Sequence, residues 1–201
     1  MKIICIGRNY LEHAKEMGKH ITKDPIFFLK PDTSLISKKQ PFFLPNFSEN
    51  IHYEAELVYK IKKVGKSIDP VFSKDYYEKV ALGIDFTARD LQAKCKSNGH
   101  PWEIAKSFDQ SALVSEHFFD VKSIKDLNFS LMKNGEIVQK GNANEMVFNI
   151  DQIISYVSKF ITLKIGDLIF TGTPSGVGSV KIGDKLEGFI NDARVFSLNI
   201  K

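Results

Sequence analysis

Residues 51–59 constrain this chain most, because Ile-His-Tyr-Glu-Ala-Glu-Leu-Val-Tyr places two carboxylates inside a run that favours a β-strand. Side chains two residues apart in a strand leave from the same face. We therefore expect His52, Glu54 and Glu56 to project to one side, and the alternate side chains of 53–59 to pack in a core. The stretch predicts a strand with one packed face and one charged face.

Two ionised carboxylates on one strand face repel each other. At about 4 Å the repulsion is about 1 kcal/mol in water and about 4 kcal/mol at the effective dielectric of a partly shielded site. A shared proton, a cationic side chain, a metal ion or exposure to solvent can offset it. The Glu-x-Glu pattern alone leaves all four open, including a solvated strand face without a function.

The composition limits the classes of protein to consider. The chain has 201 residues, which is enough for one well-packed domain over residues 1–201. Its 28 basic and 24 acidic residues give a net charge of +4, and the basic residues are spread out, which argues against a nucleic-acid surface. Two cysteines are too few for a disulfide framework. We find no signal peptide and no membrane-spanning stretch, so we expect a cytoplasmic protein without a membrane partner.

Hydrophobic periodicity and turn residues predict a β-rich α+β chain. Asn9 is the expected N-cap of a first helix that Gly18 ends, and Ser73, Thr87 and Asp151 are expected to cap three more. The expected strands cover 2–6, 25–30, 51–64, 104–109, 127–132 and 136–139, and the expected helices cover 10–17, 74–82, 88–97 and 151–160.

Two turn signals are specific. Asn134-Gly135 between two apolar runs predicts a β-hairpin. Lys-Ile-Gly-Asp occurs at 164–167 and again at 181–184, each time ahead of an apolar strand. We interpret this recurrence as turn chemistry rather than as a domain repeat.

Several polar side chains are placed where they could form a site. His13 and Glu16 are three residues apart on the first expected helix, and a carboxylate beside an imidazole raises its basicity, as a general base requires. Asp85 lies just ahead of a helix on which Arg89 and Gln92 share a face. For each group, solvated polar residues are the alternative.

Lys106 and the loop 171–178 are two further candidates. Lys106 stands among small and apolar neighbours, where it could neutralise a carboxylate, bind an anion or reach the surface. The loop, Thr-Gly-Thr-Pro-Ser-Gly-Val-Gly, can present backbone N–H groups to an anion. It lacks the Gly-Lys-Ser/Thr and the following helix of a nucleotide-binding P-loop.

Glu54, Glu56 and Asp85 supply three oxygen donors of the kind that Mg²⁺ and Mn²⁺ prefer. Three carboxylates on a six-coordinate ion would leave positions for water and for a substrate that chelates through two oxygens. A 2-oxo acid is such a chelator.

Taken together, these motifs resemble the fumarylacetoacetate hydrolase superfamily, and within it the short acylpyruvase and oxaloacetate decarboxylase branch. The resemblance covers nearly the whole chain, and the order of its motifs is very specific for the superfamily. It rests on Gly7–Tyr10, His13, Glu16, Phe28–Pro31, His52–Leu57, Asp85–Asp90, Pro101–Trp102, Ala105–Phe108 and Thr171–Gly178.

The resemblance implies a fold and a site. The fold is a mixed β-roll or sandwich with flanking helices, similar to the C-terminal domain of fumarylacetoacetase, in a homodimer. Mg²⁺ or Mn²⁺ would be bound by Glu54, Glu56 and Asp85. The catalytic group would be His13, Glu16 and Lys106, and the substrate-binding group would be Arg89, Gln92, Gly172 and Thr173. His13 and Glu16 would lie on a mobile lid over about residues 9–24 that orders when substrate binds.

The resemblance also implies a function, namely a divalent-metal-dependent hydrolase or decarboxylase of small 2-oxo acids. Such an enzyme cleaves acylpyruvates by C–C bond hydrolysis, or decarboxylates oxaloacetate, through a metal-bound enolate. One alternative is the isomerase and decarboxylase that acts on 2-hydroxyhepta-2,4-diene-1,7-dioate in aromatic catabolism. A non-enzymatic alternative is a metal-dependent carboxylate-binding module. The pair of His13 and Glu16 argues against it, because carboxylate binding alone needs no base.

Overall fold

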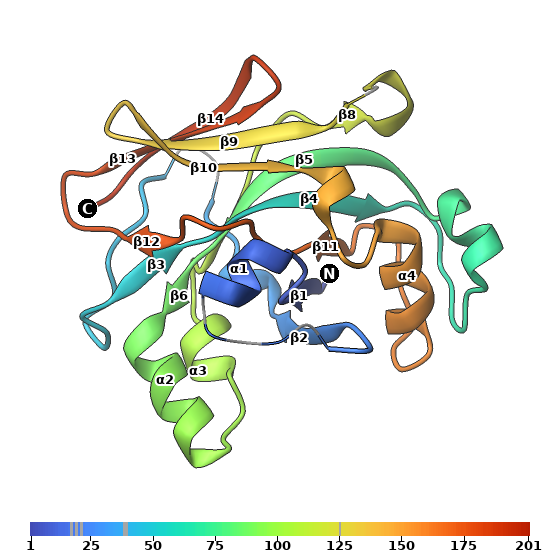
Figure 1. Cartoon of the computed structure of the whole chain (residues 1–201), viewed down its shortest axis with the longest axis horizontal. Coiled ribbons are helices and arrows are strands. Elements are labelled where there is room, and N and C mark those ends of the chain that lie inside the picture. The colour runs from blue at the N-terminus through green and yellow to red at the C-terminus, as the bar shows by residue number, and fades with distance from the viewer. Residues whose placement is uncertain (17, 19, 21, 38–39, 125) are drawn as a thin grey trace.

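The computed structural model describes residues 1–16, 18, 20, 22–37, 40–124 and 126–201. Figure 1 shows a strand-rich molecule with a few short helices around curved sheets, so the predicted α+β class is confirmed. The strands are β1 (Ile3–Gly7), β2 (Ile26–Lys30), β3 (Ile51–Tyr53), β4 (Ala55–Ile61), β5 (Tyr77–Asp85), β6 (Thr87–Ala88), β7 (Ala112–Val114), β8 (Phe119–Asp120), β9 (Asn128–Lys133), β10 (Glu136–Asn142), β11 (Leu168–Phe170), β12 (Gly178–Ser179), β13 (Lys185–Ile190) and β14 (Ala193–Asn199). The α-helices are α1 (Leu11–Glu16), α2 (Arg89–Asn98), α3 (Glu103–Lys106) and α4 (Ile150–Ser158). Among the described residues, no helix is long and apolar enough to cross a membrane.

The strands form three sheets. A seven-stranded mixed sheet has the order β2-β1-β11-β4-β5-β7, with β8 also paired to β5, and only its β1–β11 pair is parallel. A four-stranded antiparallel sheet, β10-β9-β13-β14, forms the upper layer in Figure 1. A small sheet, β12-β3-β6, continues from β4 and β5 on the side where α2 and α3 lie.

The seven-stranded sheet is covered by apolar side chains on both faces. The main core joins side chains of this sheet, such as Leu57 and Leu82, to those of the four-stranded sheet, such as Leu131 and Leu186. A second, smaller cluster of buried residues lies on the opposite face, formed by Ile3, Cys5, Val58, Ala81, Ala112, Leu168 and Phe170. The strands that carry the carboxylates therefore have little freedom to shift.

The Glu-x-Glu stretch is confirmed as two-faced, although it is not one continuous strand. The chain leaves the small sheet after β3 and joins the large sheet at β4, with Glu54 at the break. Tyr53, Ala55, Leu57 and Tyr59 lie in the main core as predicted. Glu54 and its neighbour Glu56 are 5% and 2% exposed, so the solvated alternative is excluded.

Two predicted elements are wrong. The helix expected over 74–82 is largely strand β5, which pairs with β4 along one edge and with β7 and β8 along the other. These pairings satisfy its backbone groups, and the alternating Val80, Leu82 and Ile84 pack in the main core. The strand expected over 104–109 instead begins with the short helix α3, which carries Lys106.

The predicted boundaries of the helices agree with the structure better than their predicted N-caps do. α2 and its C-cap at Gly99, with a φ of +67°, are confirmed, but Thr87 does not cap this helix, because its hydroxyl instead contacts Lys106. α4 is capped by Asn149 rather than Asp151. The amide side chain of Asn9 binds Phe148 and Thr171 instead of capping α1.

The predicted turns are present in the structure, whereas the predicted lid is described only in part. Asn134 and Gly135 adopt φ values of +55° and +88° between β9 and β10, so the hairpin is confirmed. The two Lys-Ile-Gly-Asp segments are matching turns, in which the aspartate accepts a hydrogen bond from the lysine N–H three residues earlier. Of the lid expected over 9–24, Met17, Lys19 and Ile21 lie outside the described residues.

Gly83 lies where β4, β5 and β7 meet, and it provides a test of this packing. A Cβ atom there would be 2.5 Å from the Leu113 carbonyl oxygen and 2.7 Å from Val58. We expect Gly83→Ala to lower the free energy of unfolding by about 1–3 kcal/mol, because overpacking forces its neighbours to move. Denaturant unfolding measures the change. Gly7→Ala is the control, since its nearest contact would be 3.9 Å away. An equal effect of both substitutions would contradict the packing described.

Candidate metal centre and active site

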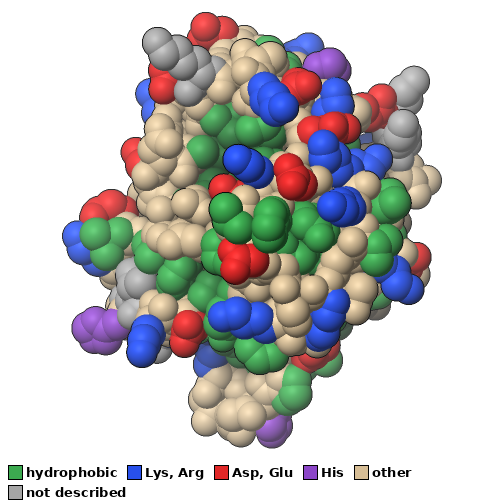
Figure 2. Space-filling model, turned by 90° about the vertical axis from the view of Figure 1, so that its right-hand side faces the viewer, with side chains coloured by type: hydrophobic (Ala, Val, Ile, Leu, Met, Phe, Trp, Pro, Cys, Tyr) green, Lys and Arg blue, Asp and Glu red, His purple; other side chains and the backbone are tan. Residues whose placement is uncertain are grey.

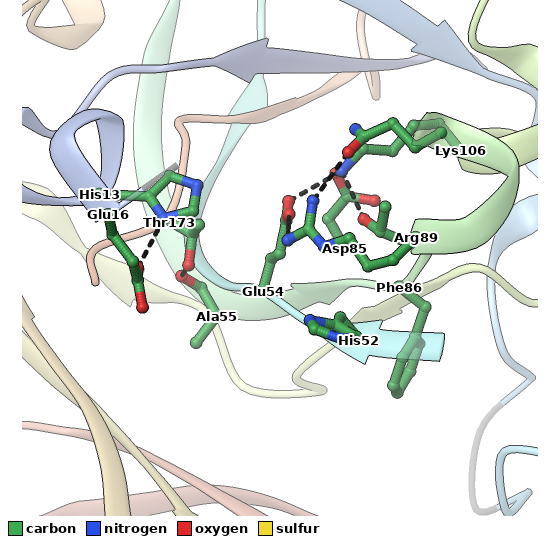
Figure 3. A network of polar contacts seen from close by, with 12 residues as sticks. His13, Glu16, His52, Glu54, Ala55, Asp85, Phe86, Arg89, Lys106 and Thr173 are labelled. Atoms are coloured by element: carbon green, nitrogen blue, oxygen red, sulfur yellow. Dashed lines mark hydrogen bonds and ion pairs between the residues drawn. The ribbon is translucent and has the colours of Figure 1, made fainter. Parts of the chain in front are cut away.

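Three buried carboxylates converge where β3, β4 and β5 meet. The Asp85 N–H donates to the Glu54 carbonyl at 2.9 Å, and Glu56 pairs with Gly83 in the β4–β5 register, so the backbone holds the three side chains together. One oxygen of each carboxylate lies within 4.8 Å of the others. The predicted ligand set of Glu54, Glu56 and Asp85 is thus brought together at one point. Figure 3 shows two of these side chains, Glu54 and Asp85, close together.

Lys106 and Arg89 lie against this cluster. The Lys106 ammonium is 2.8 Å from Glu54 Oε2, 2.7 Å from Asp85 Oδ2 and 2.6 Å from the Thr87 hydroxyl. Arg89 forms an ion pair with Glu54, and its Nη1 donates to Gln92 Oε1 at 2.9 Å. Figure 3 shows both cations reaching the carboxylates from the same side, so the residues predicted around the metal do meet there.

Lys30 is a third cation at the cluster, and the sequence analysis gave it no role. Its side chain is fully buried, with Nζ 2.8 Å from Asp85 Oδ1 and 2.9 Å from the Ser111 hydroxyl. The contact with Asp85 has the distance of an ion pair without the alignment of a hydrogen bond, so Oδ1 has no hydrogen-bond donor among the described residues. A lysine at the end of the apolar strand 26–30 is the signal that could have indicated it.

The pKa values of Glu54 and Glu56 are shifted in opposite directions. Burial raises the pKa of Glu54, but Lys106 and Arg89 outweigh it and hold that pKa well below its usual range. Burial raises the pKa of Glu56 well above its usual range, and the charges of Asp85 and Glu54 raise it further. Burial alone would lower the pKa of Lys106, but Asp85 and Glu54 raise it, so Lys106 stays charged. Glu56 therefore requires a proton or a further cation.

The donor set fits a divalent cation. It consists of carboxylate oxygens alone, which suits Mg²⁺ or Mn²⁺ better than Zn²⁺. Glu56 forms no ion pair with any residue that the structure describes, and Asp85 Oδ1 has no aligned hydrogen-bond donor there, although the Lys30 ammonium lies 2.8 Å away. Both features are those expected of metal ligands.

The predicted dyad lies across the same cavity. His13 is 8% exposed on α1, with Nδ1 3.2 Å from Glu16 Oε2. Glu16 also accepts from the Gly176 N–H at 3.3 Å, which fastens α1 to the loop after β11. His13 and the three carboxylates line one cavity, and Figure 3 shows the dyad on the side opposite Arg89.

The loop after β11 holds the carboxylate strand. The Gly172 N–H donates to Glu56 Oε2 at 2.7 Å, and the Thr173 hydroxyl donates to the Ala55 carbonyl at 2.8 Å. Thr173 also lines the cavity, whereas Gly172 does not. Gly172 and Thr173, two of the four predicted substrate-binding residues, thus support the strand that carries Glu56.

Gln139 is a second residue that the sequence analysis missed. It is buried on β10, accepts from the Ala55 N–H at 2.9 Å and donates to Thr173 Oγ1 at 2.9 Å. It therefore joins the strand break after Glu54 to the loop. A lone glutamine in a hairpin strand gives no local signal of this long-range role.

His52 does not join the site. It was expected on the same face as Glu54, but it bonds Asn50 at 2.9 Å and does not line the cavity. Burial and the nearby Arg89 lower the pKa of His52 to about 4. His52 lies on β3 in the small sheet, before the chain passes to the large sheet at Glu54, and this position places it away from the cavity.

Comparisons with known proteins agree with this geometry. The family model described as fumarylacetoacetate (FAA) hydrolase C-terminal matches residues 2–201. The oxaloacetate tautomerase FAHD1, mitochondrial, of Mus musculus is 43% identical over 202 residues, covering 99% of this chain and 91% of its own. The oxaloacetate decarboxylase, mitochondrial, of Dictyostelium discoideum is 43% identical over 190 residues, covering 92% and 87%.

A solved structure has the same fold as this chain. The fumarylpyruvate hydrolase of Pseudomonas aeruginosa, crystallised in complex with Mn²⁺ and pyruvate, superposes with a TM-score of 0.92 at 34% identity, covering 100% of this chain and 89% of its own. The fold is thus shared over the whole length of this chain. The chain belongs to the fumarylacetoacetate hydrolase family.

Proposed function

We propose that this protein is a divalent-metal-dependent enzyme that cleaves small 2-oxo acids, by hydrolysis of acylpyruvates or decarboxylation of oxaloacetate. The observation that carries the proposal is the buried cluster of Glu54, Glu56 and Asp85, with one cavity joining it to the His13–Glu16 pair. The family membership and the reactions in the names of the relatives support it.

The acidic cluster would hold Mg²⁺ or Mn²⁺ through Glu54, Glu56 and Asp85. A bound divalent cation supplies Lewis-acid stabilisation of the negative charge that develops on the 2-oxo oxygen. Lys106, kept charged by Asp85 and Glu54, adds positive charge beside that oxygen and keeps the two carboxylates in place. The Mn²⁺ in the fumarylpyruvate hydrolase complex supports this assignment.

His13 would act as the general base in hydrolysis. The contact of Nδ1 with Glu16 orients the ring and leaves Nε2 to take a proton from water. The resulting hydroxide adds to the distal carbonyl carbon, the adjacent C–C bond breaks, and its electron pair remains on the pyruvate part as an enolate. Decarboxylation forms the same enolate without a water attack, so it does not need this base.

The remaining residues would bind the substrate. Arg89 and Gln92 are hydrogen-bonded to each other on the cavity wall, where they can contact the substrate's polar groups. Thr173 lines the cavity and is proposed to contact the carboxylate of the 2-oxo acid. Gly172 is proposed to contribute indirectly, because its hydrogen bond to Glu56 holds that carboxylate in position.

An isomerase is the second candidate, and the tautomerase name of the mouse relative favours it. Moving a proton between C3 and the 2-oxo oxygen uses the same enolate and needs only an acid–base group such as His13. A carboxylate-binding module without turnover is not supported, because the chain belongs to a family whose named relatives are enzymes. The buried His13–Glu16 contact counts against it.

The proposal includes a homodimeric assembly, a mobile lid carrying α1, a cytoplasmic location and no nucleic-acid partner. The lid would carry His13 and Glu16, and its closed position is supported by the hydrogen bond that Glu16 accepts from the Gly176 N–H. The names of the mouse and Dictyostelium relatives place those proteins in mitochondria. Fractionation and size-exclusion chromatography with light scattering test the location and the assembly.

The metal assignment predicts that Glu56→Gln abolishes Mg²⁺-dependent release of pyruvate from acetylpyruvate and carbon dioxide from oxaloacetate. The substitution removes a ligand charge while keeping the shape of the side chain. Glu78→Gln, at an exposed ion pair with Lys62, is the matched control. Wild-type turnover by Glu56→Gln, or turnover by the wild type in excess EDTA, would contradict the assignment.

The assignment of His13 as the general base predicts that replacing His13 lowers kcat, whereas replacing His52 does not. His13→Ala should lower kcat for acetylpyruvate hydrolysis by about 10²- to 10⁴-fold, the usual contribution of a general base. Mn²⁺ affinity should stay unchanged, because His13 is not a proposed ligand. His52→Ala, which alters a histidine outside the cavity, should keep kcat. Equal kcat values for both variants would remove His13 from the reaction.

A further inference from the structure

Ala55 lies between two of the proposed metal ligands, and one side of its backbone has no strand beside it. The Asp85 N–H donates to the Glu54 carbonyl, so in this antiparallel pair the N–H and carbonyl of Ala55 point to the other edge of β4. On that edge β11 ends at Phe170, opposite Val58. Ala55 is fully buried, so its two backbone groups need partners from elsewhere in the chain.

Two side chains supply these partners. Gln139 Oε1 accepts from the Ala55 N–H at 2.9 Å, and the Thr173 hydroxyl donates to the Ala55 carbonyl at 2.8 Å. Gln139 Nε2 donates to Thr173 Oγ1 at 2.9 Å, which closes a ring of hydrogen bonds, and to the Pro174 carbonyl at 3.0 Å. Figure 3 shows Thr173 beside Ala55. A hydroxyl has one proton, so the amide that donates to Thr173 directs that proton to Ala55.

An irregularity in β10 aims Gln139 at Ala55. The β9–β10 register shifts between Ile137 and Gln139, so Val138 is an extra residue in the strand. A β-bulge of this kind re-aims a side chain beside it. The loop after β11 lies against the bulge, since a Cβ atom at Gly176 would be 2.1 Å from the Val138 carbonyl oxygen. Gln139 therefore reaches from the four-stranded sheet to the edge of the seven-stranded sheet.

The backbone at Ala55 sets the directions in which Glu54 and Glu56 leave the chain. At Glu54 the chain passes from the small sheet to the large one, so regular strand pairing is interrupted beside Ala55. Without Gln139 the buried Ala55 N–H would have no partner, and the segment would rearrange to satisfy it. Gln139 does not line the cavity, so its effect on the carboxylates passes through Ala55.

We propose that Gln139 is a positioning residue of the metal centre, which holds Ala55 so that Glu54 and Glu56 face the same divalent cation. Thr173 shares this role through the ring of hydrogen bonds. The inference rests on the proposed function, because it assumes that these carboxylates bind a metal ion. It adds a residue of the four-stranded sheet that contacts neither the metal nor the substrate and yet determines the affinity for the metal.

The Mn²⁺ affinity of Gln139→Met tests this role. Methionine has about the length of glutamine but forms none of the hydrogen bonds of Gln139. We expect the Kd for Mn²⁺, measured by electron paramagnetic resonance, to rise about 10- to 100-fold, the usual effect of losing a group that orients metal ligands. Gln152→Met is the matched control. It removes a glutamine hydrogen bond at the start of α4, outside the cavity, and should leave this Kd unchanged.

Variants of Thr173 show whether the ring acts as one unit. Thr173→Val keeps the shape of the side chain without the hydroxyl and should weaken Mn²⁺ binding, whereas Thr173→Ser keeps the hydroxyl and should retain most of the affinity. The double variant Gln139→Met/Thr173→Val should bind Mn²⁺ about as weakly as the weaker single variant, because residues of one hydrogen-bond network do not act additively. Effects that multiply would contradict the ring, because they would show two independent contributions.

A measurement without metal follows the same contact. In the metal-free protein, the Ala55 amide hydrogen should exchange with solvent faster in Gln139→Met than in the wild type, because its acceptor is lost. Exchange of this amide in Gln152→Met should equal that of the wild type. NMR spectroscopy follows the exchange at single residues. Equal protection of Ala55 in the wild type and in Gln139→Met would overturn the contact on which the proposal depends.

The outcomes separate the positioning role from the proposed function and from a merely structural role. If the wild type has a Mn²⁺ site and folded Gln139→Met binds Mn²⁺ equally well, the positioning role is overturned and the metal site stands, even if the unfolding temperature falls. If Gln139→Met does not fold, equal Mn²⁺ affinities of Thr173→Val and Thr173→Ser overturn the role. If the wild type binds no Mn²⁺ and cleaves neither acetylpyruvate nor oxaloacetate, the proposed function is wrong and the role with it.

Discussion

The repulsion among three buried carboxylates is the constraint on which the rest of this structure depends. Glu54, Glu56 and Asp85 lie within 4.8 Å of one another and out of contact with bulk solvent. A buried charge without a partner costs several kcal/mol, so each one needs a cation or a proton. Lys106 and Lys30 contact Asp85, and Lys106 also contacts Glu54, while Glu56 is left for a proton or a metal ion. The same three negative charges make the cluster able to hold a divalent metal ion.

Distant parts of the chain keep this cluster in place. The β4–β5 register aligns the carboxylates, and the smaller apolar cluster supports that pair of strands from the side of Val58. Gln139 on β10 and Thr173 on the loop after β11 satisfy the backbone of Ala55, where the strand changes sheets. A metal site built on paired strands is more rigid than one built on loops. Helix α1, which carries His13 and is the proposed mobile element, lies outside these paired strands and contacts the loop after β11.

The parts of the site that the sequence predicted are those with a local pattern. The alternation in 51–59 placed Glu54 and Glu56 together, and Asn134-Gly135 fixed the hairpin that carries Gln139. The three-residue helical spacing paired His13 with Glu16, and the local sequence marked Asp85 and Lys106 as candidates, whereas their roles were implied by the family resemblance. The sequence failed where long-range pairing decides: residues 77–85 form a strand because β4 and β7 flank them, and the partners of Lys30 and Gln139 are far apart in the chain. His52 was expected beside the carboxylates, but it lies on β3 in the small sheet, and the sequence gives no local signal of the change of sheet at Glu54.

Binding of Mn²⁺ to the wild-type protein tests the central claim most directly, because it depends on the acidic cluster and not on the choice of substrate. Titration followed by electron paramagnetic resonance separates free from bound Mn²⁺. The account predicts one saturable site per chain, displaced by Mg²⁺ and lost in Glu56→Gln. Mn²⁺ that stays free throughout the titration, or a site of equal affinity in Glu56→Gln, would contradict it.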